Sequence, residues 1–189
     1  NKQISLYLNS FYQIDFVQSI VLFFSDFPIF VLPIFLVSFW IYYSYKKNDD
    51  KKKSLLFIFY SVVLAIVISY VIKTIHHVDR PMMSLETAWN LVLSKIPDAS
   101  FPSDHAWVSI SFLTSLFLFW YKKIGFLLLP FFILMNLSRV VGWIHWPLDI
   151  IAWVLNWIIS AFIIYKLRFF DIFKKVNNFL IKIASFFKL

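Results

Sequence analysis

The sequence predicts an all-α membrane protein, a polytopic helix bundle with five to six transmembrane helices. Apolar residues make up 61% of the 189 positions and charged residues only 15%, which is not the composition of a soluble globule. Several apolar runs reach the roughly 20 residues that a helix needs to cross the hydrocarbon core of a bilayer. These runs lack the alternation of transmembrane β-strands, so a helical bundle is expected.

The apolar runs and their flanking helix signals predict a single membrane-embedded domain over residues 1–189. Its core, 27–167, holds five spans, expected at 27–45, 54–75, 104–120, 124–141 and 147–167. The apolar stretch 14–24 is too short to span, so residues 1–26 are expected to lie at the interface or enter the bilayer in part; a sixth span forms if the stretch joins the residues before it. Residues 168–189 mix Lys with Phe and Ile at helical spacing and predict an amphipathic helix on the membrane surface.

The charges predict which side each loop faces. Thirteen of the eighteen Lys and Arg residues fall in 46–53, in 122–123 and from 166 onward, all on one side of the predicted spans. The positive-inside rule places this side, with the C-terminus, in the cytoplasm. The net charge of +8 is therefore a feature of helix ends and does not indicate nucleic-acid binding. No signal-peptide cleavage site is evident, and with no cysteine present, disulfides and thiolate metal sites are excluded.

The stretch KTIHHVDRP places two cations near the outer end of the second span. Lys73 and Arg80 are seven residues apart, about two helical turns, so they are expected to share one face with an anion between them. The alternative for Lys73 is a side chain that only extends toward water at a helix end. His76 and His77 are adjacent in sequence and face different directions on a helix, so a metal site is not expected.

The stretch FPSDHAW begins the third span. Ser103 is a good N-cap residue, so the backbone N–H groups of Asp104 and His105 are candidate donors to an anion, with the Ser103 hydroxyl as a further donor. His105 is expected to lie beside the anion at the same helix N-terminus. The alternative is an ordinary capped helix with a histidine at the interface.

The stretch SRVVGWIHWPLDI joins the fourth and fifth spans. Pro147 is expected to start the last helix, which puts His145 just ahead of it and Asp149 near its third residue. A carboxylate there can reach back and hold the imidazole in one tautomer, ready to act as a neutral nucleophile. The alternative is a histidine in an aromatic interfacial belt. Together with Arg139, the three stretches supply cations around a helix N-terminus, which suits a phosphoryl group.

These residues resemble a known signature. Lys73-x6-Arg80-Pro81, Pro102-Ser103-x-His105 and Ser138-Arg139-x5-His145-x3-Asp149 are similar to the three motifs of the type 2 phosphatidic acid phosphatase superfamily. The resemblance implies that His145 attacks phosphorus to form a phosphohistidine, that Asp149 orients it, and that His105 acts as acid and then base. It implies that the phosphate oxygens are held by Lys73, Arg80, Ser103 and Arg139. It also implies that no metal or other cofactor is needed.

One departure from the superfamily narrows the resemblance. Asp104 stands where most members have Gly, and an acid beside a phosphate site repels the substrate unless it points away. DASFPSDHA, KIG and HWPLDI resemble the bacitracin-resistance type of undecaprenyl pyrophosphate phosphatase. This implies a bacterial plasma membrane enzyme that removes the terminal phosphate of undecaprenyl pyrophosphate on the outer face and recycles the cell-wall carrier lipid.

Other functions stay open at this point. The substrate could be phosphatidylglycerophosphate, phosphatidate or a lipid A phosphate, because all present a phosphate to the same residues. A distant alternative is a non-catalytic membrane protein. The stretch after Pro81 is either a plain loop or a short helix capped by Ser84 that forms a flap over the site. Neither the oligomeric state nor transfer of phosphate to another acceptor is determined by the sequence.

Overall fold

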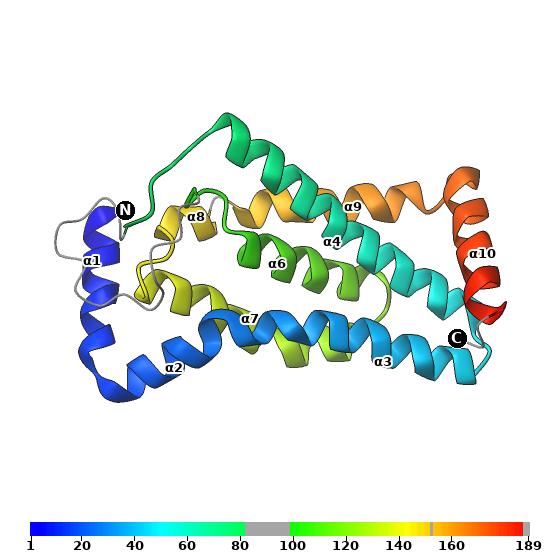
Figure 1. The fold of residues 1–189 in the computed structure, drawn as a ribbon, viewed down its shortest axis with the longest axis horizontal. Coiled ribbons are helices and arrows are strands. Elements are labelled where there is room, and N and C mark those ends of the chain that lie inside the picture. Colours follow the sequence, from blue (N-terminus) through cyan, green and yellow to red (C-terminus); the bar gives the residue numbers. More distant parts are fainter. Residues whose placement is uncertain (82–98, 152, 187–189) are drawn as a thin grey trace.

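The chain folds into a bundle of long helices with a shorter helix across each end (Figure 1). A computed structural model describes residues 1–81, 99–151 and 153–186. The elements are α1 (Lys2–Ser10), η1 (Phe11–Gln13), α2 (Asp15–Asp26), η2 (Phe27–Phe30), α3 (Val31–Tyr45), α4 (Asp49–Ile75), α6 (Asp104–Leu118), α7 (Lys122–Val141), α8 (Pro147–Ile151), α9 (Trp153–Leu167) and α10 (Asp171–Phe186). The predicted all-α membrane bundle is confirmed. The stretch with the predicted flap, including Ser84, lies outside the described residues.

Among the described residues, three helical segments have the length and apolar character needed to cross a bilayer: Asp15–Tyr45, Asp49–Ile75 and Lys122–Val141. The first differs from the predicted span 27–45, because α2 runs through η2 into α3 and the whole segment is 31 residues long. The second begins five residues before the predicted 54. Its early start has a local cause, since the Asn48 side chain accepts a hydrogen bond of 3.0 Å from the Lys51 N–H and caps the helix.

The helix α6 lies at the centre of the bundle and packs against α4, α7 and α9. Its buried face mixes large apolar residues such as Phe112 and Leu116 with serines. The Ser111 hydroxyl donates to the Ser61 carbonyl at 2.9 Å and lies 3.1 Å from the Ser160 hydroxyl. Small polar residues let helices approach closely where lipid gives no hydrophobic driving force between them. The start of α6, which carries the FPSDHAW motif, is thereby held in the middle of one bundle end.

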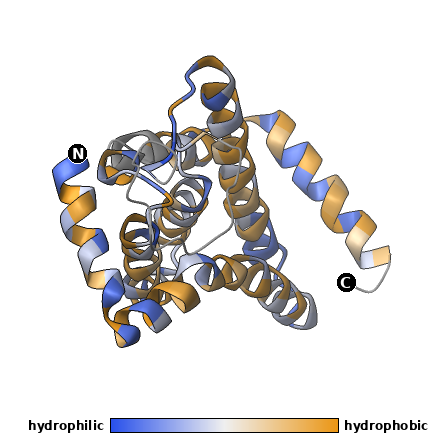
Figure 2. Cartoon of the chain, turned by 60° about the vertical axis from the view of Figure 1, so that its left-hand side comes forward, coloured by the Kyte–Doolittle hydropathy of each residue, from blue (hydrophilic) through white to orange (hydrophobic). Residues whose placement is uncertain are grey.

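The short helix α1 lies across that same end, and α10 lies across the opposite one (Figure 1). Figure 2 shows polar and apolar residues alternating around α10, as predicted for an amphipathic helix. The helix α1 is tied to the bundle by side chains: the Asn9 amide donates to the Val141 carbonyl at 2.8 Å, and the Asn1 side chain accepts from the Leu148 N–H at 3.2 Å. Both contacts are to the α7–α8 region, so α1 supports the segment that carries His145.

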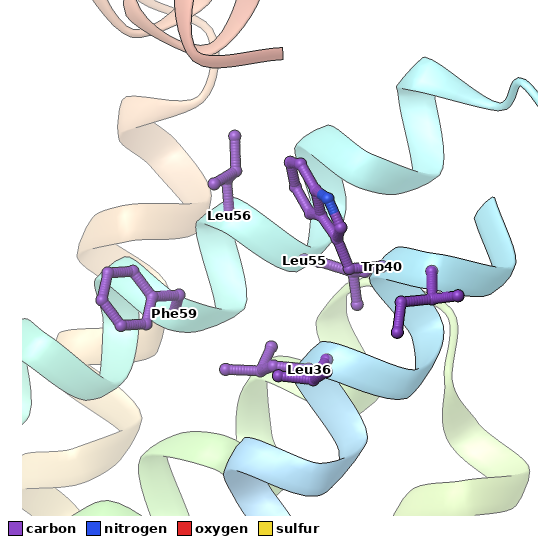
Figure 3. Close-up of a pocket in the computed structure, with 7 residues that line it drawn as sticks. Leu36, Trp40, Leu55, Leu56 and Phe59 are labelled. Atoms are coloured by element: carbon purple, nitrogen blue, oxygen red, sulfur yellow. The ribbon is translucent and has the colours of Figure 1, made fainter. Parts of the chain in front are cut away.

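An apolar pocket lies between α3 and α4 (Figure 3), and these parts of the two helices are in the half of the bundle farther from α1 (Figure 1). It is lined by Leu36, Val37, Trp40, Ile41, Leu55, Leu56 and Phe59. These side chains carry no charge, so this pocket offers packing to lipid and has no chemistry of its own. The polar residues singled out by the sequence gather elsewhere, at the α1 end.

Candidate active site

The predicted site residues come together at the end of the bundle that α1 crosses, from the three stretches of sequence that carry the motifs. Lys73 lies in the last turn of α4 and Arg80 in the extended segment after it. Ser103 and His105 lie at the start of α6, Arg139 in the last turn of α7, His145 in the α7–α8 loop, and Asp149 in α8. Ser103, Arg80, Arg139, His145 and Asp149 are all at most 4% exposed.

The α7–α8 loop folds back on the end of α7. The Arg139 carbonyl accepts two backbone hydrogen bonds, from Ile144 at 3.0 Å and from His145 at 3.1 Å. This turn needs Trp143 in the left-handed region at φ 58°, which costs a residue with a side chain about 1–2 kcal/mol. Burial of the Trp143 ring, and its N–H donated to the Ser5 carbonyl at 3.2 Å, offset that cost. The backbone thus fixes His145 relative to Arg139.

His145 is held with one ring nitrogen bonded and the other left for chemistry. Its Nδ1 lies 2.7 Å from the Ser100 carbonyl oxygen, which can only accept, so Nδ1 carries the proton and Nε2 has the lone pair. Burial, with the positive charges of Arg139 and Arg80 nearby, lowers the pKa of His145 well below its ordinary value of 6.5. The imidazole is therefore neutral at physiological pH, which is the state of a nucleophile.

Asp149 reaches this histidine partly through a residue that the sequence analysis did not identify. Its Oδ2 accepts from the Trp146 N–H at 2.9 Å, the reach-back expected of the third residue of a helix, and from the Ser100 hydroxyl. The same oxygen is 3.7 Å from His145 Nδ1, within range for charge stabilisation and too far for a hydrogen bond. Ser100 therefore links the two, with its carbonyl on His145 and its hydroxyl on Asp149.

Arg80 joins the site by a different route from the one predicted. Lys73 and Arg80 were predicted to share one helical face, and this prediction is wrong, because α4 ends at Ile75 and residues 76–80 are not helical. His76 takes an extended conformation at φ −131° and ψ 96°. A proline at 81 disfavours helical geometry at the residue before it, which accounts for the non-helical Arg80. The extended segment carries Arg80 over the site, where its Nη1 donates to the Ile144 carbonyl at 3.2 Å.

Asp104 points away from the core of the site toward α4. Its Oδ1 accepts from the Ser69 hydroxyl at 2.6 Å, and its Oδ2 lies 2.6 Å from the Lys73 ammonium. This orientation answers the question raised by an acid beside an anion site, because its charge is neutralised by Lys73. An ammonium has three N–H donors, so the contact with Asp104 is compatible with a phosphate contact by Lys73.

Two buried polar atoms of the site have no hydrogen-bond partner among the residues that the structure describes: the Ser103 hydroxyl and Arg139 Nε. Ser103 precedes α6 as expected, but its hydroxyl makes no capping bond to the helix. Leaving a buried polar group unpaired costs about 1–3 kcal/mol, and more when it is charged. An anion with several oxygens at the start of α6 would satisfy both atoms together with the free N–H groups of the first turn.

A second residue that the sequence analysis missed is Asp26, the last residue of α2. Its Oδ1 lies 2.7 Å from Arg139 Nη1 and 3.0 Å from His105 Nε2. The Ser25 carbonyl accepts a further bond of 3.1 Å from the same Arg139 nitrogen. Nothing in the local sequence around Asp26 distinguishes it from a helix-terminal acid, because its partners are more than 75 residues away along the chain.

An apolar groove of about 500 Å³ runs beside the site along α6 and α7. At the site end it is lined by Val140 and Pro147, close in sequence to Arg139 and His145, and by Ile4 and Leu8 of α1. Farther along it is lined by Ile110, Leu113, Phe117, Leu129, Phe132 and Ile133. The groove could hold a hydrocarbon chain whose polar head reaches the arginines.

Residues 54–172 match the profile of the PAP2 superfamily, which is more than half of the chain. The chain belongs to the PAP2 superfamily. All three motifs from Lys73 to Asp149 lie inside the matched region, whereas Asp26 lies outside it.

The chain is also similar to individual proteins. The PAP2 chain is 27% identical over 166 residues to the undecaprenyl-diphosphatase BcrC of Bacillus subtilis, covering 88% of this chain and 81% of that protein. It is 28% identical over 148 residues to the bacitracin transport permease protein BcrC of Bacillus licheniformis, covering 77% and 69%. The crystal structure of Aquifex aeolicus LpxE superposes with a TM-score of 0.63 at 24% identity over 88% of this chain and 94% of that one, which supports the fold. The protein is therefore a membrane-embedded lipid phosphatase of the PAP2 superfamily.

Proposed function

We propose that this phosphatase removes the terminal phosphate of undecaprenyl diphosphate on the outer face of the bacterial plasma membrane. The observation that carries the proposal is a pair of buried donors, Ser103 Oγ and Arg139 Nε, that have no partner in the described part of the chain and lie in a site with two histidines and a second arginine. A phosphate group matches that donor set in charge and in number of acceptors. The choice of lipid rests on the name of the Bacillus subtilis relative.

In the first step, His145 Nε2 attacks the terminal phosphorus. A P–N bond forms, the P–O bond to the lipid phosphate breaks, and the electron pair of that bond stays on the leaving oxygen. His105 gives its proton to this oxygen, so the products are phosphohistidine and undecaprenyl phosphate. Arg80 and Arg139 stabilise the charge on the phosphoryl oxygens. Proton transfer of this kind typically raises the reaction rate about 10²–10⁴-fold, and each positioned hydrogen-bond donor raises it about 10²–10³-fold.

In the second step, water is the nucleophile and the roles reverse. His105, now neutral, takes a proton from the water as its oxygen bonds to phosphorus. The P–N bond breaks, its electron pair returns to His145 Nε2, and inorganic phosphate leaves. Asp149 keeps its negative charge through both steps and stabilises the positive charge that develops on the His145 ring. No step requires a metal.

The outer location and the lipid chain have their own support. The basic stretches 46–53 and 122–123, together with α10, lie at the end of the bundle opposite the site, so the positive-inside rule directs the site outward (Figure 1). The apolar groove between α1, α6, α7 and α8 begins at the end of the bundle that holds the site, and it is suited to the isoprenoid chain. An outward-facing site of this kind would recycle the carrier lipid of cell-wall synthesis.

The test is a phosphate-release panel with purified protein in detergent micelles, comparing undecaprenyl diphosphate, phosphatidate and phosphatidylglycerophosphate. We expect the diphosphate to give the highest kcat/KM and vanadate to compete with it. The variant His145→Gln should lose more than about 10⁴-fold in kcat and all acid-labile ³²P labelling. Equal rates on the three lipids would refute the substrate assignment, and full activity of His145→Gln would refute the mechanism.

A further inference from the structure

The N-terminal segment contributes a carboxylate to a site that otherwise belongs to the region 54–172. Asp26 lies at the junction of α2 and η2, and α2 packs along α7. Arg139 fixes this junction with two hydrogen bonds. Its Nη1 donates to the Ser25 carbonyl at 3.1 Å and to Asp26 Oδ1 at 2.7 Å. Ser25 is fully buried, whereas the Asp26 side chain remains 43% exposed and faces the mouth of the site.

The contact with His105 is specific in its atoms. Asp26 Oδ1 lies 3.0 Å from His105 Nε2, and the His105 ring makes no other hydrogen bond with the residues that the structure describes. A carboxylate only accepts, so Nε2 carries a proton in this contact. A second proton, on Nδ1, makes the ring a cation, and that cation is the form stabilised by an adjacent carboxylate. The ring is then fixed with Nδ1–H as its one unengaged donor.

We infer that Asp26 is a positioning residue that orients His105 and favours its protonated form, so that His105 Nδ1–H faces the leaving oxygen. The inference rests on the proposed function, in which His105 is the general acid. When the P–O bond breaks, the Nδ1 proton moves to the leaving oxygen and Asp26 stays a carboxylate on Nε2–H. In hydrolysis, Nδ1 takes the proton from water and the ion pair is restored. The arrangement parallels the other half of the site, where the Ser100 carbonyl accepts from Nδ1 of His145, Asp149 lies 3.7 Å from the same atom, and Nε2 is left for the substrate.

A competing explanation is that Asp26 occupies the place of a phosphate oxygen and must be displaced by substrate. Its contact with Arg139 suits either explanation, but the two differ in what removing the charge does. Loss of a positioning carboxylate slows the chemical step and lowers kcat. Loss of a displaced carboxylate removes a competitor, which lowers KM and leaves kcat unchanged.

The decisive experiment compares Asp26→Asn and Asp26→Glu with Asp15→Asn on lipid phosphate hydrolysis. Asp15 is a matched control, an exposed acid on the same helix that no described contact links to the site. We expect kcat to fall about 10- to 100-fold in Asp26→Asn, to recover in part in Asp26→Glu, and to stay unchanged in Asp15→Asn. A lower KM with unchanged kcat in Asp26→Asn would overturn the inference.

The pH profile supplies a readout that a purely structural role would not move. The charged groups acting on His105 are Asp26 of α2, Arg139 of α7 and Asp104 of α6. Removing Asp26 takes away one of the two negative charges near His105. The alkaline limb of the pH profile of kcat should therefore move to lower pH in Asp26→Asn and stay in place in Asp15→Asn. An unshifted limb would contradict the inference.

A measurement independent of turnover separates this inference from the proposed function. Diethyl pyrocarbonate modifies neutral imidazole, so the ion pair should protect His105. Peptide mapping should find His105 modified several-fold faster in Asp26→Asn than in wild type or Asp15→Asn. Equal rates would overturn the inference whatever lipid the enzyme hydrolyses. Wild type and Asp15→Asn without phosphate release from any lipid would instead refute the proposed function.

Discussion

The variant Asp149→Asn tests how the charge behind His145 contributes to the reaction. In the structure the tautomer of His145 is fixed by the Ser100 carbonyl at 2.7 Å, whereas Asp149 acts across 3.7 Å. Two unit charges at that distance interact by about 4 kcal/mol at an effective dielectric constant of about 20. With between half and all of the charge on the ring in the transition state, the loss is about 2–4 kcal/mol, or roughly 30- to 1,000-fold in kcat.

This range lies below the loss of about 10⁴-fold expected where the acid alone fixes the tautomer. The assay is the initial rate of phosphate release in micelles, with kcat and KM measured separately and KM expected to change little. Asp79→Asn is the matched control, because it makes the same charge change at the same end of the bundle on an exposed side chain. A kcat of Asp149→Asn within threefold of wild type would refute charge stabilisation, and a loss above 10⁴-fold would refute the role given to the Ser100 carbonyl.

Three further outcomes are expected. Asp104→Asn removes one partner of Lys73 and a negative charge near the anion, so KM should fall about two- to tenfold. A rise of KM by the same factor would mean that Asp104 holds Lys73 in its binding geometry. Because the pKa of His145 is well below 6.5 and the attacking form is neutral, the acidic limb of the kcat/KM profile should lie below pH 6.5, and a limb at or above that value would contradict the burial of the ring. Ile133→Trp narrows the apolar groove and should raise KM for undecaprenyl diphosphate about fivefold without changing inhibition by vanadate.

The groove prediction has a close control on the same helix. Leu134 is the next residue, is 39% exposed, and does not line the groove. Leu134→Trp adds the same bulk toward lipid, so it should leave KM unchanged. An equal rise of KM in both variants would mean that the effect comes from the surface of α7 in general.

Local rules were enough to place most motif residues on their elements. Ser103 precedes α6 because it is an N-cap type followed by a helix-forming run, and Pro147 begins α8 because its fixed φ suits a first helical position. Asp149 reaches back to the Trp146 N–H for the same local reason. These features depend on residues at most four positions apart, which a single sequence displays.

The exceptions are residues whose partners are distant along the chain. Asp26 meets Arg139 across 113 positions, and Ser100 meets Asp149 across 49. Arg80 was assigned to a helical face by its spacing, yet an extended segment carries it to the Ile144 carbonyl. Spacing along a helix can be counted only where the helix continues, and α4 ends at Ile75, where the predicted span 54–75 also ends.

The sequence by itself determined the class of protein, the motif residues and the order in which they occur, because apolar length, capping and residue type are local properties. Only the tertiary structure decided which atoms meet. It turned Asp104 toward Lys73, put Ser100 between His145 and Asp149, and brought α2 beside α7 so that Asp26 reaches His105. The physical reason is that these contacts depend on how helices pack side by side, and helix packing depends on side chains far apart in the sequence.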